Sequence, residues 1–329
     1  MMAESRVSVA LCTYNGERFV RQQIESILLQ RPRPDELIVS DDGSTDQTLS
    51  IVREIAESPL ADGVTVVVLT GERPLGVTRN FQRAVEAATG DLIALSDQDD
   101  VWHEGRLERI VARFAADEGL LLVHTDADLV DTDGQPLHRT LFESLEVTAS
   151  EFDAELAGRA FDAFIRRNLA TGATVVFRRT LLDVTLPFAD GWVHDEWLAA
   201  VAAAAGRVEV LQEPTIDYRQ HDSNQIGVAA PTVAGKMRRV LEPRGDRNAV
   251  LATRFGVLAD RLAALGDRVP PGFVDAAREK ARFEAERAAL PANRLRRPWR
   301  VRRIAVGGRY ERFASRGRAD IIRDLLQPA

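Results

Sequence analysis

The chain has 329 residues, 45% of them hydrophobic and 28% charged, and its formal net charge is −7. This balance is typical of a globular protein with an ordinary core, and the acidic net charge gives no reason to expect nucleic-acid binding. A single cysteine, Cys12, excludes a disulfide framework and argues against a cysteine-based zinc site, while the longest wholly apolar run, from Leu198 to Ala205, is far short of a membrane span. Because the N-terminus also lacks the layout of a signal peptide, we expect a cytoplasmic protein.

The N-terminal part of the chain alternates short apolar runs with amphipathic stretches. The runs have the length of strands and lie at Val7–Leu11, Leu37–Val39, Val64–Leu69 and Leu92–Leu95. Helical spacing between these runs predicts three buried helix faces. The first consists of Val20, Ile24, Ile27 and Leu28. The second, which follows a capping box of Ser44 and Gln47, consists of Leu49, Val52, Ile55 and Ala56, and the third of Phe81, Val85 and Ala88. This alternation predicts an α/β fold with a mostly parallel central sheet and helices on both faces.

Beyond Asp100 the alternation is looser. We expect a helix around Val111 and Phe114 and one over Asp195–Ala205, with strands at Leu120–Val123, Ala173–Phe177 and Val208–Leu211. From about Ala229 onward the sequence is helical in character and rich in Ala and Arg, with breaks at prolines. We therefore predict a first domain over residues 1–228 and a helical, basic C-terminal extension over residues 229–329.

Polar clusters directly follow three of the predicted strands. They are Thr13-Tyr14-Asn15, Asp41-Asp42-Gly43-Ser44 and Asp97-Gln98-Asp99-Asp100. Because ligands of such sheets bind at the carboxyl ends of the strands, we expect these clusters to lie together. Asp97 and Asp99 have a spacing that suits a hard divalent cation shared with diphosphate oxygens, although an acidic loop that caps the next helix has the same pattern.

The second cluster and the helix start near Arg79 offer contacts for a nucleotide. One of Asp41 and Asp42 is placed to accept a hydrogen bond from a base or a ribose, although Asp-Gly-Ser is also ordinary turn chemistry. Tyr14 is a candidate for stacking on a base, with core packing as the alternative. Arg79-Asn80 open a helix after Gly76, where a guanidinium and backbone N–H groups suit a diphosphate.

Two later segments carry further candidate groups. His194-Asp195-Glu196-Trp197 precedes an Ala-rich helix, so its acids are either a general base or ordinary helix-start residues. His221, which follows the strand-like segment Thr215–Tyr218, is a candidate third metal ligand or simply a polar surface residue.

Taken together, the clusters resemble glycosyltransferase family two, an inverting family with the GT-A type nucleotide-diphospho-sugar transferase fold, and within it a rhamnosyltransferase-like branch. The resemblance runs from about Val7 to Gly227, and it rests on the following segments in family order: Ser8 to Gly16, Val39 to Asp46, Ser96 to Trp102, Thr171 to Thr174, His194 to Trp197, and Tyr218 to His221. One departure is Ala173, which stands where many relatives have Cys.

The resemblance implies a role for each of these residues. Asp195 becomes the catalytic base, and a divalent metal, Mn²⁺ or Mg²⁺, is held by Asp97, Asp99 and His221. The substrate-binding residues that it implies are Thr13, Tyr14, Asn15, Glu17, Asp41, Asp42, Arg79, Asn80, Asp97, Gly172, Ala173, Glu196 and Trp197.

The implied activity is the inverting transfer of a sugar from a nucleotide diphosphate to an acceptor hydroxyl in cell-surface polysaccharide synthesis. The expected donor is dTDP-rhamnose, with UDP-hexoses next, and the expected acceptor is a saccharide or a lipid-linked sugar. Two alternatives stay open: a catalytically inactive sugar-nucleotide-binding or scaffold protein, and a nucleotidyltransferase of similar fold. Against the nucleotidyltransferase, Thr13 to Glu17 lack the Gly-rich, basic loop that such enzymes carry after the first strand.

The C-terminal tail is strongly basic. From Arg294 onward the chain carries eleven Arg and three acidic residues, and the same segment contains Trp299 and Tyr310. Either this tail packs on the acidic body, or it contacts the anionic inner face of a membrane, where an Arg near the surface contributes about 1 kcal/mol.

Overall fold

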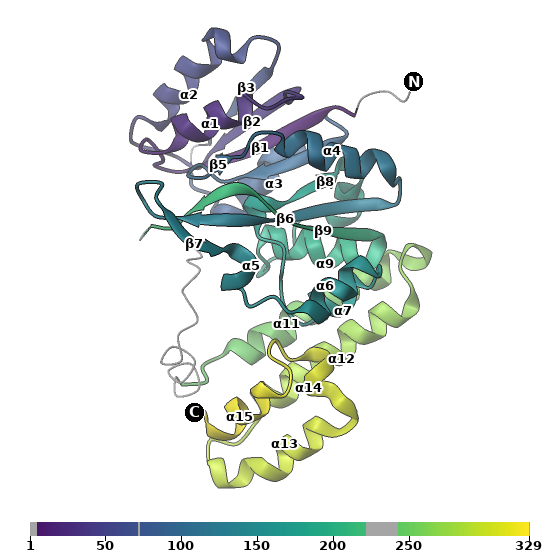
Figure 1. The fold of residues 1–329 in the computed structure, drawn as a ribbon. Helices are drawn as coiled ribbons and strands as arrows, with labels where there is room; N and C mark the ends of the chain where they lie inside the picture. Colours follow the sequence, from purple (N-terminus) through teal and green to yellow (C-terminus); the bar gives the residue numbers. More distant parts are fainter. Residues whose placement is uncertain (1–4, 72, 222–242, 329) are drawn as a thin grey trace.

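The computed structural model describes residues 5–71, 73–221 and 243–328. The predicted boundary between residues 228 and 229 lies outside these ranges, so the division into two domains stays a prediction. Figure 1 shows the strands in the upper and middle parts of the molecule and the C-terminal helices α11 to α15 at its lower end.

In the described part of the chain the strands form a nine-stranded sheet, in the order β3-β2-β1-β4-β8-β6-β9-β5, with β7 beside β6. Its first four strands are parallel: β1 (Val7–Thr13), β2 (Glu36–Asp41), β3 (Thr65–Leu69) and β4 (Leu92–Ser96). The rest of the sheet is mixed, because β5, β7 and β8 run against their neighbours: β5 (Val101–Trp102), β6 (Leu120–Val130), β7 (Pro136–Thr140), β8 (Val176–Arg178) and β9 (Arg207–Arg219).

Both faces of this sheet are covered by helices, as the sequence predicts. In β1, Val9 and Leu11 belong to one apolar cluster and Ala10 and Cys12 to another, because successive side chains point to opposite faces. The first cluster takes in α1 (Val20–Leu28), α2 (Thr48–Ala56) and α4 (Arg106–Ala116). The second takes in α3 (Val77–Ala87), α7 (Ala160–Phe164) and α9 (His194–Ala205).

Short helices connect the later strands. They are α5 (Leu141–Ser144), α6 (Ala149–Leu156) and α8 (Leu182–Thr185), together with the 3₁₀ turns Pro59–Ala61, Gly172–Thr174 and Arg179–Leu181. Both α5 and α6 begin with a complete capping box, formed by Thr140 with Glu143 and by Thr148 with Glu151.

The C-terminal helices share an apolar core with the sheet. They are α11 (Arg247–Ala264), α12 (Pro271–Ala288), α13 (Arg297–Ala305), α14 (Arg309–Phe313) and α15 (Ala319–Leu326), with 3₁₀ turns at Gly266–Arg268, Arg294–Arg296 and Val306–Gly308. Phe255 of α11 and Phe283 of α12 belong to the same cluster as α3 and α9. The indole of Trp192 also donates to the Arg254 carbonyl at 3.1 Å. The extension is therefore packed against the helix layer below the sheet.

A buried charge network ties the last helices together. Lys280 Nζ donates to Glu284 Oε1 at 2.7 Å, Arg287 Nε to Asp324 Oδ2 at 2.7 Å, and the Tyr310 hydroxyl to the same Asp324 oxygen at 2.6 Å. Removing one partner of such a network leaves a buried charge unpaired, which costs about 3–5 kcal/mol. The network thus fixes α12, α14 and α15 relative to one another.

The structure corrects three local expectations. The capping box of Ser44 and Gln47 is wrong, because the Ser44 hydroxyl donates to Asp41 at 2.6 Å and α2 begins only at Thr48, with no side-chain cap. The strand expected at Ala173–Phe177 starts at Val176, since Gly172–Thr174 form a 3₁₀ turn. The strand expected at Val208–Leu211 continues without a break to Arg219.

Candidate active site

The loops after β1 and β2 are joined by hydrogen bonds from the polar residues that the sequence singles out. Thr13 Oγ1 donates to Asp41 Oδ1 at 2.7 Å, and Asn15 Oδ1 accepts the Thr45 N–H at 2.9 Å. Glu17 Oε2 accepts the Gln47 N–H at 2.9 Å. These side chains hold the two loops in one arrangement, and Asp41 and Thr13 are buried. The nucleotide contacts implied for these residues stay predictions.

Tyr14 projects from this pair of loops, and its side chain is 54% exposed. Its backbone is held by Gln98, whose Oε1 accepts the Tyr14 N–H at 2.9 Å and whose Nε2 donates to the Tyr14 carbonyl at 3.0 Å. A Cβ at Gly16 would lie 2.1 Å from Gln98 Oε1, so a side chain there would displace the Gln98 amide. The sequence gives no role to Gln98, which links the β1 loop to the acidic segment after β4.

The carboxylate of Asp42 accepts two backbone N–H groups, from Leu75 at 2.6 Å and from Gly76 at 2.9 Å. Asp42 therefore fixes the start of α3 against the end of β2. Arg79, on the first turn of α3, pairs with Asp190 at 2.5 Å. The diphosphate contact predicted for Asn80 is corrected: its amide is buried and exchanges hydrogen bonds with Ser40, at 2.7 Å to the hydroxyl and 2.8 Å to the carbonyl.

Four carboxylates converge where β4, β9 and α9 meet. Burial and then the charges of Asp99 and Asp195 raise the pKa of Asp97 to about 7, and its carboxylate accepts no hydrogen bond from any described residue. The pKa of Tyr218, at the end of β9, is raised first by burial and then by Asp100, Asp97, Asp99 and Asp195 in turn. Negative charge is thus concentrated around one point at the edge of the sheet.

Asp99 and Asp100 are fixed by the end of β9. His221 Nε2 lies 2.7 Å from Asp99 Oδ2, and Arg219 Nε donates to the Asp99 carbonyl at 2.8 Å. Asp100 Oδ1 accepts the Arg219 N–H at 3.1 Å, and its other oxygen is buried with no partner among the described residues. The structure therefore places His221 beside Asp99, and Asp97 near enough to Asp99 for the Asp99 charge to raise the Asp97 pKa. That Asp97, Asp99 and His221 form one ligand set stays a prediction. Carboxylate oxygens with an imidazole nitrogen are a donor set that fits Mn²⁺, and Mg²⁺ less closely.

Asp195 opens α9 and is almost completely buried. Its Oδ2 accepts the Gly172 N–H at 2.9 Å and its Oδ1 accepts the Glu196 N–H at 2.6 Å. Burial, the larger effect, and the neighbouring Glu196 charge raise the pKa of Asp195 to about 7, even though these hydrogen bonds oppose the rise. A carboxylate with a pKa near neutrality is suited to proton abstraction at physiological pH.

His194, to which the sequence gives no role, lies beside the same carboxylate. Its ring stacks on Phe81 with 3.9 Å between centroids, and neither ring nitrogen has a hydrogen-bond partner in the described part of the chain. Burial lowers the pKa of His194 to about 3, so the imidazole is neutral. A Cβ at Gly172 would lie 3.0 Å from His194 Nε2 and 3.6 Å from Asp195 Cβ. Gly172 therefore leaves room beside the carboxylate that a larger residue would fill, and Ala173, next in the same turn, is fully buried.

The two remaining residues of this segment point elsewhere. Glu196 pairs with Arg254 of α11, so the segment that carries Asp195 is anchored to the C-terminal extension. The substrate contact predicted for Trp197 is corrected: its ring is fully buried, and its Nε1 donates to the Thr185 carbonyl at 2.8 Å. Because α9 is apolar all round, Trp197 belongs to the core.

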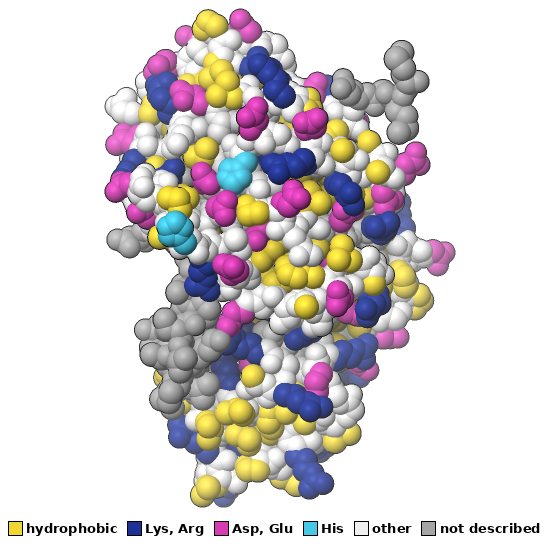
Figure 2. Space-filling view, in the orientation of Figure 1, with side chains coloured by type: hydrophobic (Ala, Val, Ile, Leu, Met, Phe, Trp, Pro, Cys, Tyr) yellow, Lys and Arg dark blue, Asp and Glu magenta, His cyan; other side chains and the backbone are white. Residues whose placement is uncertain are grey.

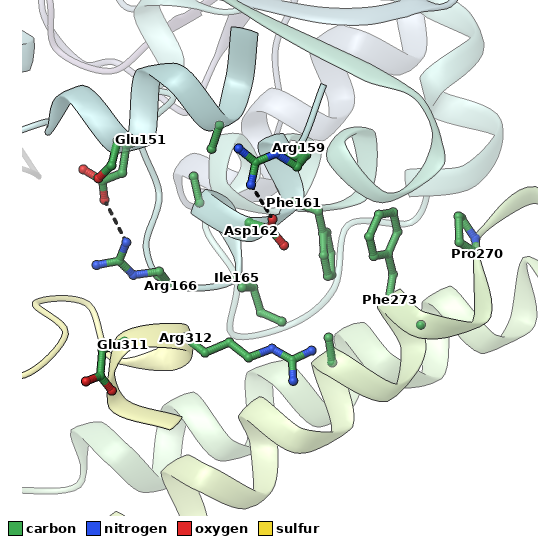
Figure 3. Close-up of a pocket in the computed structure, with 15 residues that line it drawn as sticks. Glu151, Arg159, Phe161, Asp162, Ile165, Arg166, Pro270, Phe273, Glu311 and Arg312 are labelled. Atoms are coloured by element: carbon green, nitrogen blue, oxygen red, sulfur yellow. Dashed lines mark ion pairs between the residues drawn. The ribbon is translucent and has the colours of Figure 1, made fainter. Parts of the chain in front are cut away.

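Two other features are formed by residues for which the sequence predicts no role. His103, Asp128 and Asp217 place ligand atoms within 4.8 Å of one another at the partly exposed pairing of β5, β6 and β9. A cleft of about 570 Å³ lies between α6–α7 and α12–α14, where Phe161 and Phe273 face each other (Figure 3). No residue predicted for the site lines this cleft.

Among the described residues, no helix is long and apolar enough to cross a membrane.

Comparisons with known sequences identify relatives of the chain. The family model described as "Glycosyl transferase family 2" matches residues 8–182. An uncharacterized glycosyltransferase of Nostoc sp. is 25% identical over 67% of this chain and 66% of its own length, so the chain spans just under two thirds of that relative. The dTDP-rhamnosyl transferase RfbG of Shigella flexneri is 26% identical over 66% of this chain and 73% of its own length.

Solved structures share the fold. TarS 1–349 of S. aureus, in complex with UDP-GlcNAc, matches 97% of this chain and 89% of its own with a TM-score of 0.58 and 17% identity. The mannosyltransferase PcManGT of Pyrobaculum calidifontis, in complex with GDP-Man and Mn²⁺, matches 92% of this chain and 74% of its own with a TM-score of 0.54 and 20% identity.

Proposed function

Because the chain belongs to glycosyl transferase family 2 and has the GT-A type fold, we propose that it is an inverting glycosyltransferase that moves a sugar from a nucleotide diphosphate to an acceptor hydroxyl. The observation that carries the proposal is the convergence of Asp97, Asp99 and Asp195 at the carboxyl ends of the strands. In α/β sheets this edge is where ligands bind.

The donor is proposed to lie over the loops after β1 and β2. Tyr14 offers an exposed ring for the base, and the Asp42-fixed start of α3 offers backbone N–H groups, with Arg79 nearby, for the diphosphate. Asp97, Asp99 and His221 would hold the divalent cation, Mn²⁺ or Mg²⁺. When bound, that cation supplies positive charge to a leaving diphosphate.

Asp195 is proposed to accept the proton of the attacking hydroxyl. Its carboxylate is held by the Gly172 and Glu196 N–H groups, so its remaining lone pairs have a fixed direction. Burial keeps bulk water away, and a pKa of about 7 leaves a basic oxygen at neutral pH. The proton moves from the acceptor oxygen to an Asp195 oxygen as that hydroxyl attacks the anomeric carbon from the side opposite the diphosphate.

We propose dTDP-rhamnose as the donor and a saccharide or a lipid-linked sugar as the acceptor, in cell-surface polysaccharide synthesis. The rhamnose assignment is supported by the relative whose name states dTDP-rhamnosyl transfer. UDP-linked sugars stand next, because the TarS structure binds UDP-GlcNAc. We further propose that the protein works in the cytoplasm, at the inner face of the cell membrane, where a lipid-linked acceptor would be found.

Thermal unfolding with single nucleotides tests this proposal. At a concentration of about 100 times Kd, a nucleotide that binds the native state adds about 2.7 kcal/mol to its free energy of unfolding. We expect dTDP or UDP with Mn²⁺ to raise the Tm by several degrees, and the effect to vanish with excess chelator. Turnover of dTDP-rhamnose or a UDP-hexose then separates an enzyme from an inactive binding protein. A Tm unmoved by every pyrimidine diphosphate would refute the proposal.

A further inference from the structure

The surface around α13 combines exposed apolar side chains with arginines. Leu295, Trp299 and Val306 are 89%, 69% and 69% exposed. Around them lie exposed arginines, so that the α13 surface consists of Arg294, Leu295, Arg296, Trp299, Arg300, Arg302, Arg303 and Val306. Figure 1 places α13 at the end of the molecule far from α1 and α2. At that end Figure 2 shows hydrophobic side chains gathered with Lys and Arg side chains around them.

The geometry of α13 separates a packed side from this surface. Arg297, Val301 and Ile304 are buried and lie on one side of the helix. At 3.6 residues per turn, Trp299 lies on the opposite side and points away from the body. Arg302 and Arg303 follow it by three and four residues, so they flank the indole on the helix surface. An indole between two guanidinium groups is thus presented to the outside.

Ten of the eleven arginines of the tail fall into two groups, and the eleventh, Arg323 of α15, is half-buried. The first is used inside the protein: Arg309, Arg312, Arg316 and Arg318 pair with Glu286, Glu279, Glu146 and Glu311, and buried Arg297 donates to the carbonyls of Pro291, Ala292, Asp324 and Gln327. The side chains of the second group make no hydrogen bond, ion pair or ring contact with any described residue, and they belong to Arg294, Arg296, Arg300, Arg302 and Arg303. Only the second group belongs to the α13 surface.

We propose that the α13 surface docks on a bilayer that contains anionic lipids. Arginines without internal partners are complementary to lipid phosphates, and an exposed Trp among them is suited to the boundary between headgroups and acyl chains. A soluble polyanion would also attract the arginines. It would not favour the exposure of Leu295, Trp299 and Val306 on the same surface, whereas a bilayer buries all three. The docking does not depend on the proposed chemistry.

Flotation of the full chain with vesicles tests this inference. The probes are vesicles of phosphatidylcholine alone and of phosphatidylcholine with about 30% phosphatidylglycerol. The wild type should float with the anionic vesicles only and detach at about 0.5 M NaCl, because salt screens surface charge. The triple substitution Arg300→Gln, Arg302→Gln and Arg303→Gln should lower the partition coefficient about 100-fold, and Trp299→Ser about tenfold.

A matched control removes the same charge from the same tail. Arg312→Gln, Arg316→Gln and Arg318→Gln also remove three positive charges, but from arginines that are paired internally. We expect this control to bind within about twofold of the wild type. Each variant is compared by its Tm, so that a folding defect is recognised. Equal loss in both triple variants, or no binding of the wild type to anionic vesicles, overturns the inference. So does retention of binding by Trp299→Ser together with full displacement by heparin, which would assign the arginines to a soluble polyanion.

Discussion

Replacing Asp195 by Asn should raise stability while it removes activity. The folded protein holds this carboxylate almost completely buried, with a pKa raised to about 7 from an ordinary value of 3.8. The native state therefore binds the Asp195 proton more tightly than the unfolded chain does. It follows that the carboxyl group stabilises the native state less and less as the pH rises from about 4 to about 7. Asn keeps the shape and has no charge to bury.

The magnitude follows from the pKa difference. At pH 8 the buried charge costs at most about 4 kcal/mol, and at pH 5 at most about 2 kcal/mol, since one pKa unit corresponds to about 1.4 kcal/mol. The Asn amide loses one of the two backbone hydrogen bonds, from Gly172 and Glu196, that the carboxylate accepts. That loss is the same at both pH values. The difference between the stability gains at pH 8 and pH 5 therefore isolates the charge, and we expect about 1–3 kcal/mol.

The assay is thermal unfolding of wild type and Asp195→Asn at pH 5 and pH 8, with chelator present so that no metal is bound. The same substitution at Asp183, an exposed carboxylate of α8, is the matched control and should give equal shifts at the two pH values. In parallel, kcat of Asp195→Asn should fall about 10²–10⁴-fold with little change in donor affinity, because the lost proton acceptor acts in the transition state.

Two results would refute this reasoning. A stability change that is equal at pH 5 and pH 8 would mean that Asp195 does not titrate with a raised pKa. A larger loss of kcat in Glu196→Gln than in Asp195→Asn would assign the base to the neighbouring residue. We expect Glu196→Gln to act mainly on stability, because its carboxylate pairs with Arg254 of α11.

Further predictions concern the metal and the space beside the base. Asp99→Ala should abolish the Mn²⁺-dependent rise in Tm with dTDP or UDP, since it removes a carboxylate ligand and the partner of His221. An unchanged rise in Tm would exclude Asp99 as a metal ligand. With His221→Ala, activity should shift in favour of Mg²⁺ over Mn²⁺, because a nitrogen donor favours manganese, and an unaltered metal preference in steady-state assays would count against the imidazole. Gly172→Ala should lower kcat/KM about tenfold with little change in Tm, because the added methyl group would press on His194 and Asp195. Normal kinetics of this variant would show that the substrates do not use the space beside Gly172.

The four parallel strands and the two helix layers could be predicted from the sequence, whereas the antiparallel pairs of the other strands could not. In β1, β2 and β4 every residue is buried, and alternate side chains enter opposite apolar clusters, so these strands appear as continuous apolar runs. The helices of this half bury the faces that the 3.6-residue spacing indicates. Such periodicities are local, because each residue's environment follows from the strand or helix that contains it. For the same reason the polar clusters at strand ends were predictable as one edge of the sheet, while the roles proposed for single site residues stay predictions.

Which polar groups already have a hydrogen-bond or ion-pair partner could be learned only from the folded structure. The Asp42 carboxylate accepts hydrogen bonds from the N–H groups of Leu75 and Gly76, and the side-chain amide of Asn80 donates to the Ser40 carbonyl. The same holds in the tail, where Arg318 is paired and Arg302 is not. A charged or polar residue looks alike in sequence whether it faces solvent, a partner from another element or the core, because its partner is set by long-range packing. For this reason the substrate contact that the resemblance implies for Trp197 could be judged only from the fold, which places its ring in the core.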